Sequence, residues 1–448
     1  MRSYHYLIVG NGAAGLSAAE IIRKRDPVGR ITIVTKEPYL FYSRPGIAYY
    51  ILNQVSERQL LSRGEGFYRH HNFRLRFGTI THLDLEGQLA YLDSGEPLAY
   101  DCLLLATGAS AVPPPFPGGD LKGVLTFDNL DDAKQVLKRG RKAKSAVVVG
   151  GGITAMELAE GFRHNGAKTH LIQRGDHVWP RLFDHSESAM VEREIKRDGV
   201  VLHYNDEIKE IAGKRGCVAG VRLKSGRNIK CQVVGVAIGV RPNLQLVDGG
   251  PIEVDRGILV NQTMQSNEPT VFAAGDIAQV YDRWTNKQQL DILWPSAIQE
   301  GRAAGYNMVD FVHGRQPRYY YKKSSPFNCA LLFGLHLTVI GRVGGGSDNG
   351  QKELSYLSRG SSHVWTRPLS SSHRSAWDRG GPSSIRIVMN GTQVVGAVLI
   401  GNQELADPLR RLIESEADLS SYKPELLRGG EALAMAILRA WRDWHQQW

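Results

Sequence analysis

The sequence predicts an α/β protein in which one strand–turn–helix–strand unit occurs twice and is followed by a smaller α+β domain. Three observations support this prediction. The chain has 448 residues, which is too long for a single hydrophobic core. A glycine-rich turn joins an apolar strand to a helix near the N-terminus, and the same arrangement returns at residues 146–158. After about residue 316 the pattern changes to short strands and a C-terminal helix.

The first unit begins with the apolar strand at residues 6–9, which runs directly into a Gly-x-Gly-x-x-Gly turn at Gly10, Gly12 and Gly15. An Ala-rich helix follows, and residues 31–34 form the next strand. In this context the turn is typical of a dinucleotide-binding unit. The first glycine allows a tight turn, the second lets the backbone approach a pyrophosphate, and the third lets the helix pack on the strand.

Two further features of this unit suit a dinucleotide. The first turn of the helix, which includes Ala14, offers backbone N–H groups and the positive end of the helix dipole to a phosphate. Glu37 follows Gly15 by 22 residues, near the position where an acidic side chain binds the adenosine ribose hydroxyls. The unit is therefore predicted to bind the ADP half of a dinucleotide.

The second unit repeats this order. A strand at residues 146–149 leads into a turn with Gly150, Gly152 and Ala155, and a helix and a strand at residues 169–172 follow. Two dinucleotide folds in one chain predict two cofactors that exchange electrons, rather than one cofactor and a small substrate.

Charge and composition exclude several other classes of protein. The net charge is +10, but Lys and Arg are scattered, and neither zinc-finger spacing nor an aromatic RNA-binding signature accompanies them. A solvated surface or an acidic protein partner is expected, and nucleic acid is not. His70 and His71 are adjacent, so they share no helix or strand face, and no metal site is expected.

The cysteines and the apolar runs argue against further classes of protein. The four cysteines contain no CxxC pair, which argues against zinc and against a dithiol. No apolar run approaches the roughly 20 residues that a membrane helix needs, and the N-terminus lacks the layout of a signal peptide. A cytoplasmic protein is expected.

Five ordered motifs resemble those of the FAD-dependent pyridine nucleotide oxidoreductases, the group that includes glutathione reductase and the ferredoxin reductases. They are the two glycine turns and residues 105–108, 237–243 and 272–276. The resemblance implies two Rossmann-like domains of the glutathione-reductase kind. FAD would bind a discontinuous domain of residues 1–110 and 240–315, NAD(P)H would bind residues 111–239, and residues 316–448 would form an α+β interface or dimerisation domain.

The resemblance also implies roles for individual residues. Asp276 would hydrogen-bond the flavin ribityl chain or the pyrophosphate, and the helix that starts near Trp294 would aim its positive end at the flavin. Glu157 matches an acid that lies near the nicotinamide. Other cofactor-binding residues are implied in or beside the motifs: Arg44, Thr107, Gly108, Gly239, Gly275 and Ala297.

The segment at residues 40–51 separates the subclasses of this group. Relatives that reduce disulfides carry a redox cysteine where this chain has Pro45, and only a thiolate forms the mixed disulfide of that chemistry. The segment resembles rubredoxin reductases and the flavin domain of nitrite reductases, which implies that Pro45 and Tyr49 border the reacting flavin. Ferredoxin reductases often carry a Lys near the position of Tyr49, and this chain does not.

The predicted preference for NADPH over NADH rests on the second unit. Its last fingerprint position is Ala155, which is commoner in the NADP-binding members of the group. The strand after the helix ends near Arg174 rather than at an acid, and a guanidinium can bind a 2′-phosphate with charge-assisted hydrogen bonds. Arg181 in the following loop could add a second cation.

The C-terminal third carries a weaker resemblance. Residues 394–402 with a helix at 405–414 are similar to the small domain of nitrite and nitrate reductase electron-transfer subunits, whereas residues 359–384 are expected to form a Ser/Arg-rich loop. Ile437 and three tryptophans, at 441, 444 and 448, follow a helical spacing that favours a core or subunit-docking helix, with membrane-surface attachment as the alternative.

The sequence as a whole predicts an NAD(P)H:acceptor oxidoreductase that passes electrons from FAD to an iron centre on an acidic partner protein. The chain has neither a four-cysteine [2Fe–2S] module nor siroheme ligands, so the acceptor must lie elsewhere. One alternative is a quinone reductase of the type II NADH dehydrogenase kind. The other is a flavin-binding regulatory or assembly subunit with slow turnover. The chain could form a homodimer or be a subunit of a complex under each of these interpretations.

Overall fold

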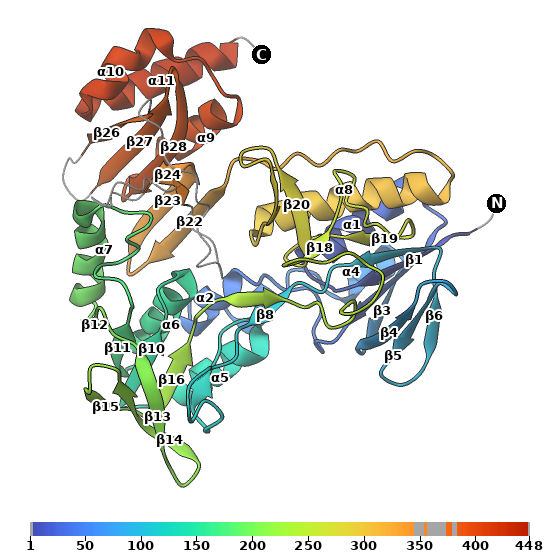
Figure 1. Cartoon of the computed structure of the whole chain (residues 1–448), viewed down its shortest axis with the longest axis horizontal. Coiled ribbons are helices and arrows are strands. Elements are labelled where there is room, and N and C mark those ends of the chain that lie inside the picture. The colour runs from blue at the N-terminus through green and yellow to red at the C-terminus, as the bar shows by residue number, and fades with distance from the viewer. Residues whose placement is uncertain (1–2, 345–353, 356–372, 379–382, 447–448) are drawn as a thin grey trace. The chain divides into compact units, whose positions relative to one another are not determined.

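The computed structural model describes residues 3–344, 354–355, 373–378 and 383–446. The chain divides into two compact units (Figure 1). Unit 1 comprises residues 1–110 and 240–323, and unit 2 comprises residues 111–239 and 324–448. Each unit is built around a five-stranded parallel sheet, which confirms the predicted α/β class.

The sheet of unit 1 is a parallel sheet covered by helices. Its strands, in spatial order, are β19 (Val271–Ala273), β7 (Cys102–Leu105), β1 (His5–Val9), β2 (Arg30–Thr35) and β3 (Phe73–Phe77). Every residue of β19, β1 and β7 is buried, as expected for parallel strands whose two faces are covered. The helices that cover this sheet include α1 (Ala13–Arg25) and α8 (Trp294–Val312).

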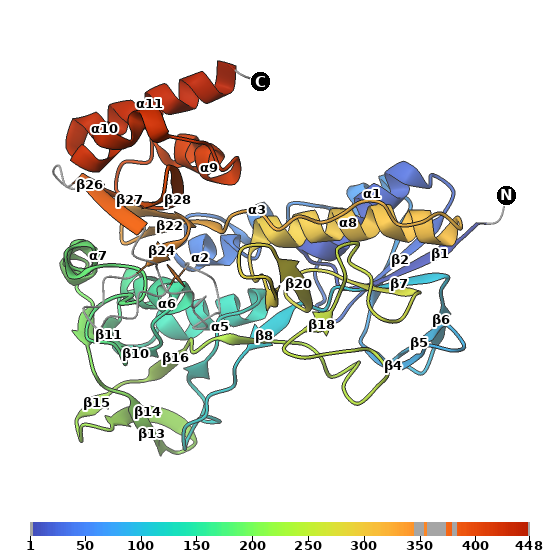
Figure 2. The same cartoon turned by 45° about the horizontal axis from the view of Figure 1, so that its top comes forward.

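Helices α1 and α8 lie side by side in both views (Figures 1 and 2). Glycine makes this close approach possible. A Cβ added at Gly301 would lie 2.1 Å from the carbonyl oxygen of Ala14, and one added at Gly305 would lie 2.7 Å from that of Ala18. Any larger residue at either position would push α8 away from the helix that follows the first glycine turn.

The rest of unit 1 consists of short elements around this sheet. An antiparallel meander of three strands follows β3, and a second three-stranded sheet precedes α8. These elements are α2 (Gly46–Ile51), α3 (Glu57–Leu60), α4 (Glu65–His70), β4 (Ile80–Asp84), β5 (Leu89–Leu92), β6 (Pro97–Ala99), β18 (Ile258–Leu259), β20 (Ala278–Asp282) and β21 (Lys287–Leu290). Strands β8 (Ala109–Ala111) and β17 (Val240–Pro242) form a separate pair.

Unit 2 repeats the parallel architecture. Its strands, in spatial order, are β12 (Val201–His203), β11 (Lys168–Ile172), β10 (Ser145–Val149), β16 (Val233–Val236) and β9 (Val124–Leu125). Three helices belong to the same part of the chain: α5 (Leu130–Gly140), α6 (Ile153–His164) and α7 (His185–Arg197). An antiparallel meander lies between β12 and β16: β13 (Ile208–Lys214), β14 (Cys217–Leu223) and β15 (Asn228–Lys230).

The C-terminal part of unit 2 is an antiparallel sheet with its helices gathered on one side (Figure 2). Its strands, in spatial order, are β22 (Phe327–Leu332), β23 (Leu335–Gly341), β28 (Gln393–Ile400), β27 (Ser384–Asn390) and β26 (His373–Asp378), and β24 (Val343–Gly344) pairs separately with β25 (Leu354–Ser355). The helices are α9 (Ala406–Glu414), the 3-10 turn η1 (Ser420–Tyr422), α10 (Lys423–Arg428) and α11 (Gly430–Gln446).

Two segments of this region bear on expectations from the sequence. The predicted loop at residues 359–384 is wrong at residues 373–378, because that stretch is the edge strand β26 paired with β27; residues 359–372 and 379–382 lie outside the described residues. In α11, Ile437 is fully buried and Trp441 and Trp444 pack against the same core, whereas Trp448 lies outside the described residues. Over the described ranges, no helix is both long and apolar enough to cross a membrane.

A buried ion pair joins the C-terminal sheet to α7. Arg386 on β27 donates from Nε to Oε1 of Glu187 at 2.8 Å and from Nη2 to Oε2 at 3.1 Å. Its other hydrogen bonds go to the carbonyl oxygens of Leu182 and Gly344, at 2.6 and 2.9 Å. Both side chains of the pair are almost completely excluded from solvent. The guanidinium therefore has acceptors on three separate segments.

Histidines connect β11, β12 and the β14–β15 turn. Arg227 Nη1 lies 2.7 Å from Nδ1 of His203, whose Nε2 lies 3.0 Å from Nδ1 of His170. Because arginine only donates, Nδ1 of His203 must accept, and its Nε2–H then donates to His170. The chain of hydrogen bonds thus requires both imidazoles to be neutral. Burial lowers the pKa of His170 to about 4, and burial with the charge of Arg227 lowers the pKa of His203.

This arrangement predicts that acid destabilises unit 2. The folded pKa of His170 lies below its unfolded value near 6.5, so the stabilisation is complete above pH 6.5 and is lost as the pH falls from 6.5 to about 4. Between pH 7.5 and pH 5 we expect the free energy of unfolding to fall by on the order of 1 kcal/mol, after allowance for partial solvent screening. Urea titrations of the wild type and of His170→Asn measure this, and an equal pH slope in both proteins would contradict the assignment.

Candidate cofactor sites

The first glycine turn lies between β1 and α1, and its backbone explains two of its three glycines. Gly10 has φ of +123°, and a Cβ there would lie 2.0 Å from the carbonyl oxygen of Ala106. A Cβ at Gly15 would lie 2.0 Å from the carbonyl oxygen of Gly10. Side chains at these positions would collide with backbone, so both glycines are required by the turn itself.

Gly12 differs from its two neighbours. No heavy atom of the described residues lies within 4 Å of a Cβ placed there, and its backbone is extended. Gly12 is also the N-cap of α1, and within the described structure no side chain caps this helix, whereas Asn129 and Asp184 cap α5 and α7. The first N–H groups of α1 therefore have no capping side chain among the described residues, an arrangement that suits a pyrophosphate.

A tyrosine that sequence reasoning missed supports this turn. The hydroxyl of Tyr68 on α4 donates to Oδ1 of Asn11 at 2.9 Å and accepts from the backbone N–H of Phe41 at 3.1 Å. Burial raises the pKa of Tyr68. Tyr68 thus fixes the residue between the first two glycines, and its distance along the chain left no local signal for this contact.

Glu37 and Arg44, both predicted to bind cofactor, lie together. Glu37 follows β2 and accepts a hydrogen bond from the hydroxyl of Tyr42 at 2.6 Å, and it also forms an ion pair with Arg44. The guanidinium of Arg44 lies 5.6 Å from the ring centroid of Tyr42. Both partners orient the carboxylate at the carboxyl end of the strand, where ligands of open α/β sheets bind.

Asn243 joins the motif at residues 105–108 to the motif at 237–243. Its side-chain amide donates to the carbonyl oxygen of Thr107 at 2.8 Å, and its backbone N–H donates to that of Gly108 at 2.9 Å. Ser110 Oγ donates to its Oδ1 at 2.8 Å. Asn243 belongs to a predicted motif but had no predicted role there, and its amide, which both donates and accepts, explains why that residue type is present.

The Gly275-Asp276 motif lies against the N-terminal end of α1, at Ala14. A Cβ at Gly275 would lie 3.1 Å from that of Ala14 and 3.8 Å from that of Ala297, so three predicted site residues from separate segments meet here. Asp276 follows and is half-buried. Trp294, the first residue of α8, packs against Phe41 with 5.8 Å between ring centroids.

Glu300 binds the backbone of this motif, a role that the sequence did not indicate. Its carboxylate Oε2 accepts a hydrogen bond from the backbone N–H of Gly275 at 2.8 Å, and the side chain is fully buried. Burial and the nearby charge of Asp291 raise its pKa well above the usual value for a glutamate. A neutral Glu300 would place no negative charge beside Asp276.

Pro45 and Tyr49 belong to the short helix α2 and its N-terminal boundary. Pro45 is its N-cap, and Tyr49 is 36% exposed. The four cysteines lie elsewhere: Cys102 and Cys231 are buried, and burial raises the pKa of Cys102 strongly and that of Cys231 to about 12. Cys217 and Cys329 are exposed, and both belong to unit 2.

The second glycine turn, between β10 and α6, reproduces the geometry of the first. Gly150 has φ of +144°, and a Cβ there would lie 2.1 Å from the carbonyl oxygen of Ala237. Gly152 is again the N-cap without a capping side chain, and among the described residues no heavy atom lies within 4 Å of its Cβ position. Ala155 is fully buried. Gly239, with φ of +122°, accepts a hydrogen bond from the backbone N–H of Val112.

The remaining predicted residues of unit 2 lie on or near this turn. Glu157 is half-buried on α6. Arg174 is exposed and follows the carboxyl end of β11, and Arg181 is exposed in the next loop. The exposed position of Arg174 leaves its guanidinium accessible to a nucleotide phosphate.

The two units thus define a class of protein with two dinucleotide turns, each open at its middle glycine and each backed by an uncapped helix. This is the class of FAD-dependent NAD(P)H oxidoreductases. The chain belongs to the pyridine nucleotide-disulphide oxidoreductase family, whose model matches residues 4–301.

Three similar proteins illustrate the relationship. The ferredoxin–NAD(+) reductase component of the biphenyl dioxygenase system of Paraburkholderia xenovorans is 33% identical over 66% of this chain and 73% of that protein. Nitrite reductase [NAD(P)H] of Bacillus subtilis is 27% identical over 92% of this chain, which spans only 48% of that relative's length. The covalent putidaredoxin reductase–putidaredoxin complex matches with a TM-score of 0.80 at 21% identity, over 97% of this chain and 99% of that one.

Proposed function

We propose that the chain oxidises NADPH and passes electrons one at a time to a partner protein that carries an iron centre. The observation that carries this proposal is the pair of open, uncapped glycine turns, one in each unit. Similarity to a ferredoxin reductase supports the choice of acceptor class. FAD, when bound, supplies the chemistry of accepting a hydride and releasing single electrons.

In this proposal residues 1–110 and 240–315 bind FAD, residues 111–239 bind the nicotinamide nucleotide, and residues 316–448 form an interface or dimerisation domain. The turn from Gly10 to Gly15 would bind the pyrophosphate, Glu37 the ribose hydroxyls, and Asp276 the ribityl side. The N-terminus of α8 would stabilise negative charge on the reduced flavin by on the order of 1 kcal/mol. Glu157 would lie near the nicotinamide, and Pro45 and Tyr49 near the flavin.

Electron transfer in this proposal needs no thiol. Unit 1 contains one cysteine, Cys102, which is fully buried in the central sheet. We expect a variant with all four cysteines replaced by Ser or Ala to keep its NADPH:ferricyanide activity within a few-fold of the wild type. Steady-state assays of flavin-loaded protein measure this, and a folded, flavin-loaded variant without activity would show that a thiol takes part.

The preference for NADPH is assigned to Arg174. A charge-assisted hydrogen bond contributes roughly 1.5–3 kcal/mol, so Arg174→Ala should lower kcat/KM about ten-fold or more with NADPH and little with NADH. Arg197, which is also exposed but lies at the end of α7, provides a matched Arg→Ala control. Equal losses with both donors, or a wild type that prefers NADH, would refute the assignment.

The acceptor is tested by direct competition among three probes. Flavin-loaded protein with NADPH is mixed anaerobically with a [2Fe–2S] ferredoxin, a rubredoxin or a short-chain ubiquinone. We expect an iron protein to be reduced fastest, and the rate to fall as salt is added, because the chain carries a net charge of +10 and its partner is expected to be acidic. Faster reduction of the quinone would favour a quinone reductase, and flavin reduction over minutes would favour a regulatory or assembly subunit.

A further inference from the structure

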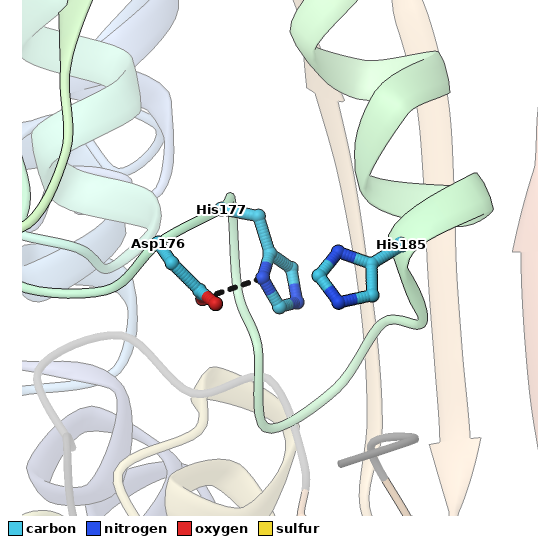
Figure 3. Close-up of side chains that lie close together, drawn as sticks. All are labelled: Asp176, His177 and His185. Carbon is cyan, nitrogen blue, oxygen red and sulfur yellow. Dashed lines mark hydrogen bonds and ion pairs between the residues drawn. The ribbon is translucent and has the colours of Figure 1, made fainter. Parts of the chain in front are cut away.

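Three potential metal ligands lie together where the loop after β11 meets α7 (Figure 3). Asp176 and His177 are neighbours in the loop, and His185 is the first residue of the helix. One donor atom from each residue lies within 4.8 Å of the other two. Asp176 Oδ1 and His177 Nδ1 are 2.6 Å apart, and the imidazole rings of His177 and His185 lie next to each other, tilted by 41°, with centroids 4.2 Å apart.

The loop that carries these ligands is anchored rather than loosely packed. Val178, Trp179 and Phe183 are buried, and Ser188 Oγ donates to the carbonyl oxygen of Val178 at 2.7 Å. The side chain of His177 itself is only 13% exposed. The position of His177 is therefore restrained by the packing of the residues that follow it in the chain.

The helix end that carries His185 is fixed as well. Asp184 and Glu187 form a capping box: the Asp184 side chain accepts from the Glu187 N–H at 2.8 Å, and the Glu187 side chain accepts from the Asp184 N–H at 3.0 Å. Glu187 is in turn held by the buried Arg386. Two preorganised segments thus bring the two imidazoles to the same place, which is what a binding site requires.

The kind of ligand follows from the donor types. Two imidazoles with one carboxylate suit Zn²⁺ and its transition-metal neighbours rather than Ca²⁺ or Mg²⁺, which prefer oxygen ligands. Zinc binds such donors at about 2.0–2.2 Å, so two donors of a tetrahedral site lie about 3.4 Å apart. The wider donor separations must therefore shorten, and the Asp176–His177 hydrogen bond must open, when the ion binds. Asp176 and His185 are exposed, so water can reach these ligands and would supply a fourth one.

We propose that Asp176, His177 and His185 bind one Zn²⁺-class ion, which fastens the loop after β11 to the start of α7. The three residues belong to neither glycine turn, although their loop also carries Arg174 and Arg181, and the proposal does not depend on the electron acceptor. Without a metal the same residues would form only an Asp–His hydrogen bond beside a second imidazole.

Zinc titration calorimetry of the flavin-loaded, chelator-treated protein tests this site. The titration is done in a Cys217→Ser/Cys329→Ser background, because these two exposed thiols could bind zinc themselves. We expect one equivalent of Zn²⁺ to bind. His185→Asn removes a direct ligand, so it should weaken zinc binding by at least about 10–100-fold, which is the cost of losing only an outer-shell partner. His82→Asn, at an exposed position on β4, should leave it unchanged.

A second measurement distinguishes loss of the metal site from loss of the fold. Circular dichroism checks that His185→Asn is folded, and Zn²⁺ should raise the Tm of the background protein but not that of this variant. The absence of saturable binding in the background protein would overturn the proposal. Equal zinc affinity in the background protein and in a folded His185→Asn variant would also overturn it.

Discussion

Replacing Gly12 by Val is expected to give a folded protein that contains no FAD. The backbone at Gly12 has φ of −90° and ψ of −168°, which any residue can adopt, and no heavy atom of the described residues lies within 4 Å of its Cβ position. The apoprotein therefore has room for the side chain. The flavin pyrophosphate does not, because it must approach this same backbone. The ratio of flavin to protein absorbance, with the Tm, measures both parts of the prediction.

Two other glycines provide matched controls. Gly64 also has extended backbone, caps the start of α4 and, within the described residues, has open space at its Cβ position, so Gly64→Val should retain FAD. Gly15→Val should instead damage the fold, because its Cβ would lie 2.0 Å from a backbone oxygen. A Gly12→Val protein with a full complement of flavin would show that unit 1 does not bind FAD at this turn.

Replacing Glu187 by Gln is expected to destabilise the protein by about 3–5 kcal/mol, since the guanidinium of Arg386 then remains buried without its counter-charge. The cost exceeds that of a surface ion pair because neither side chain can regain water without separating β27 from α7. Urea unfolding followed by circular dichroism measures the change.

The exposed pair between Arg222 and Glu210 gives the comparison. Both of its side chains are more than a third exposed, so Glu210→Gln should cost at most about 1 kcal/mol. A double variant, Glu187→Gln with Arg386→Met, should recover part of the loss, because it removes the unpaired charge. A Glu187→Gln protein as stable as the wild type would mean that the pair is open to solvent.

Much of the fold follows from local patterns in the sequence. Each glycine turn requires an apolar strand before it and a small-residue helix after it. Each of these patterns can be recognised within one short continuous segment of the sequence. The helix expected at residues 405–414 is found as α9, from Ala406 to Glu414. Strand β26 was missed because its sequence resembles a polar loop, and only pairing with β27 makes it a strand.

The supporting contacts of the site could not be predicted in the same way. Tyr68 reaches Asn11 across 57 residues, and Asn243 reaches Thr107 across 136. Glu300 reads in the sequence as an ordinary polar residue of a helix, and its role emerges only when α8 packs against α1 and presents it to Gly275. Such contacts depend on tertiary packing, so one sequence carries no local signal for them.

The most direct test of the account is anaerobic stopped-flow mixing of the flavin-loaded protein with excess NADPH. If the two open turns hold FAD and NADPH as proposed, the visible absorbance of the flavin should bleach completely and at least as fast as steady-state turnover. Gly152→Val, which would fill the open space of the second turn, should keep the flavin but abolish its bleaching. A flavin that stays oxidised in the wild type, or that bleaches equally well in Gly152→Val, would contradict the account.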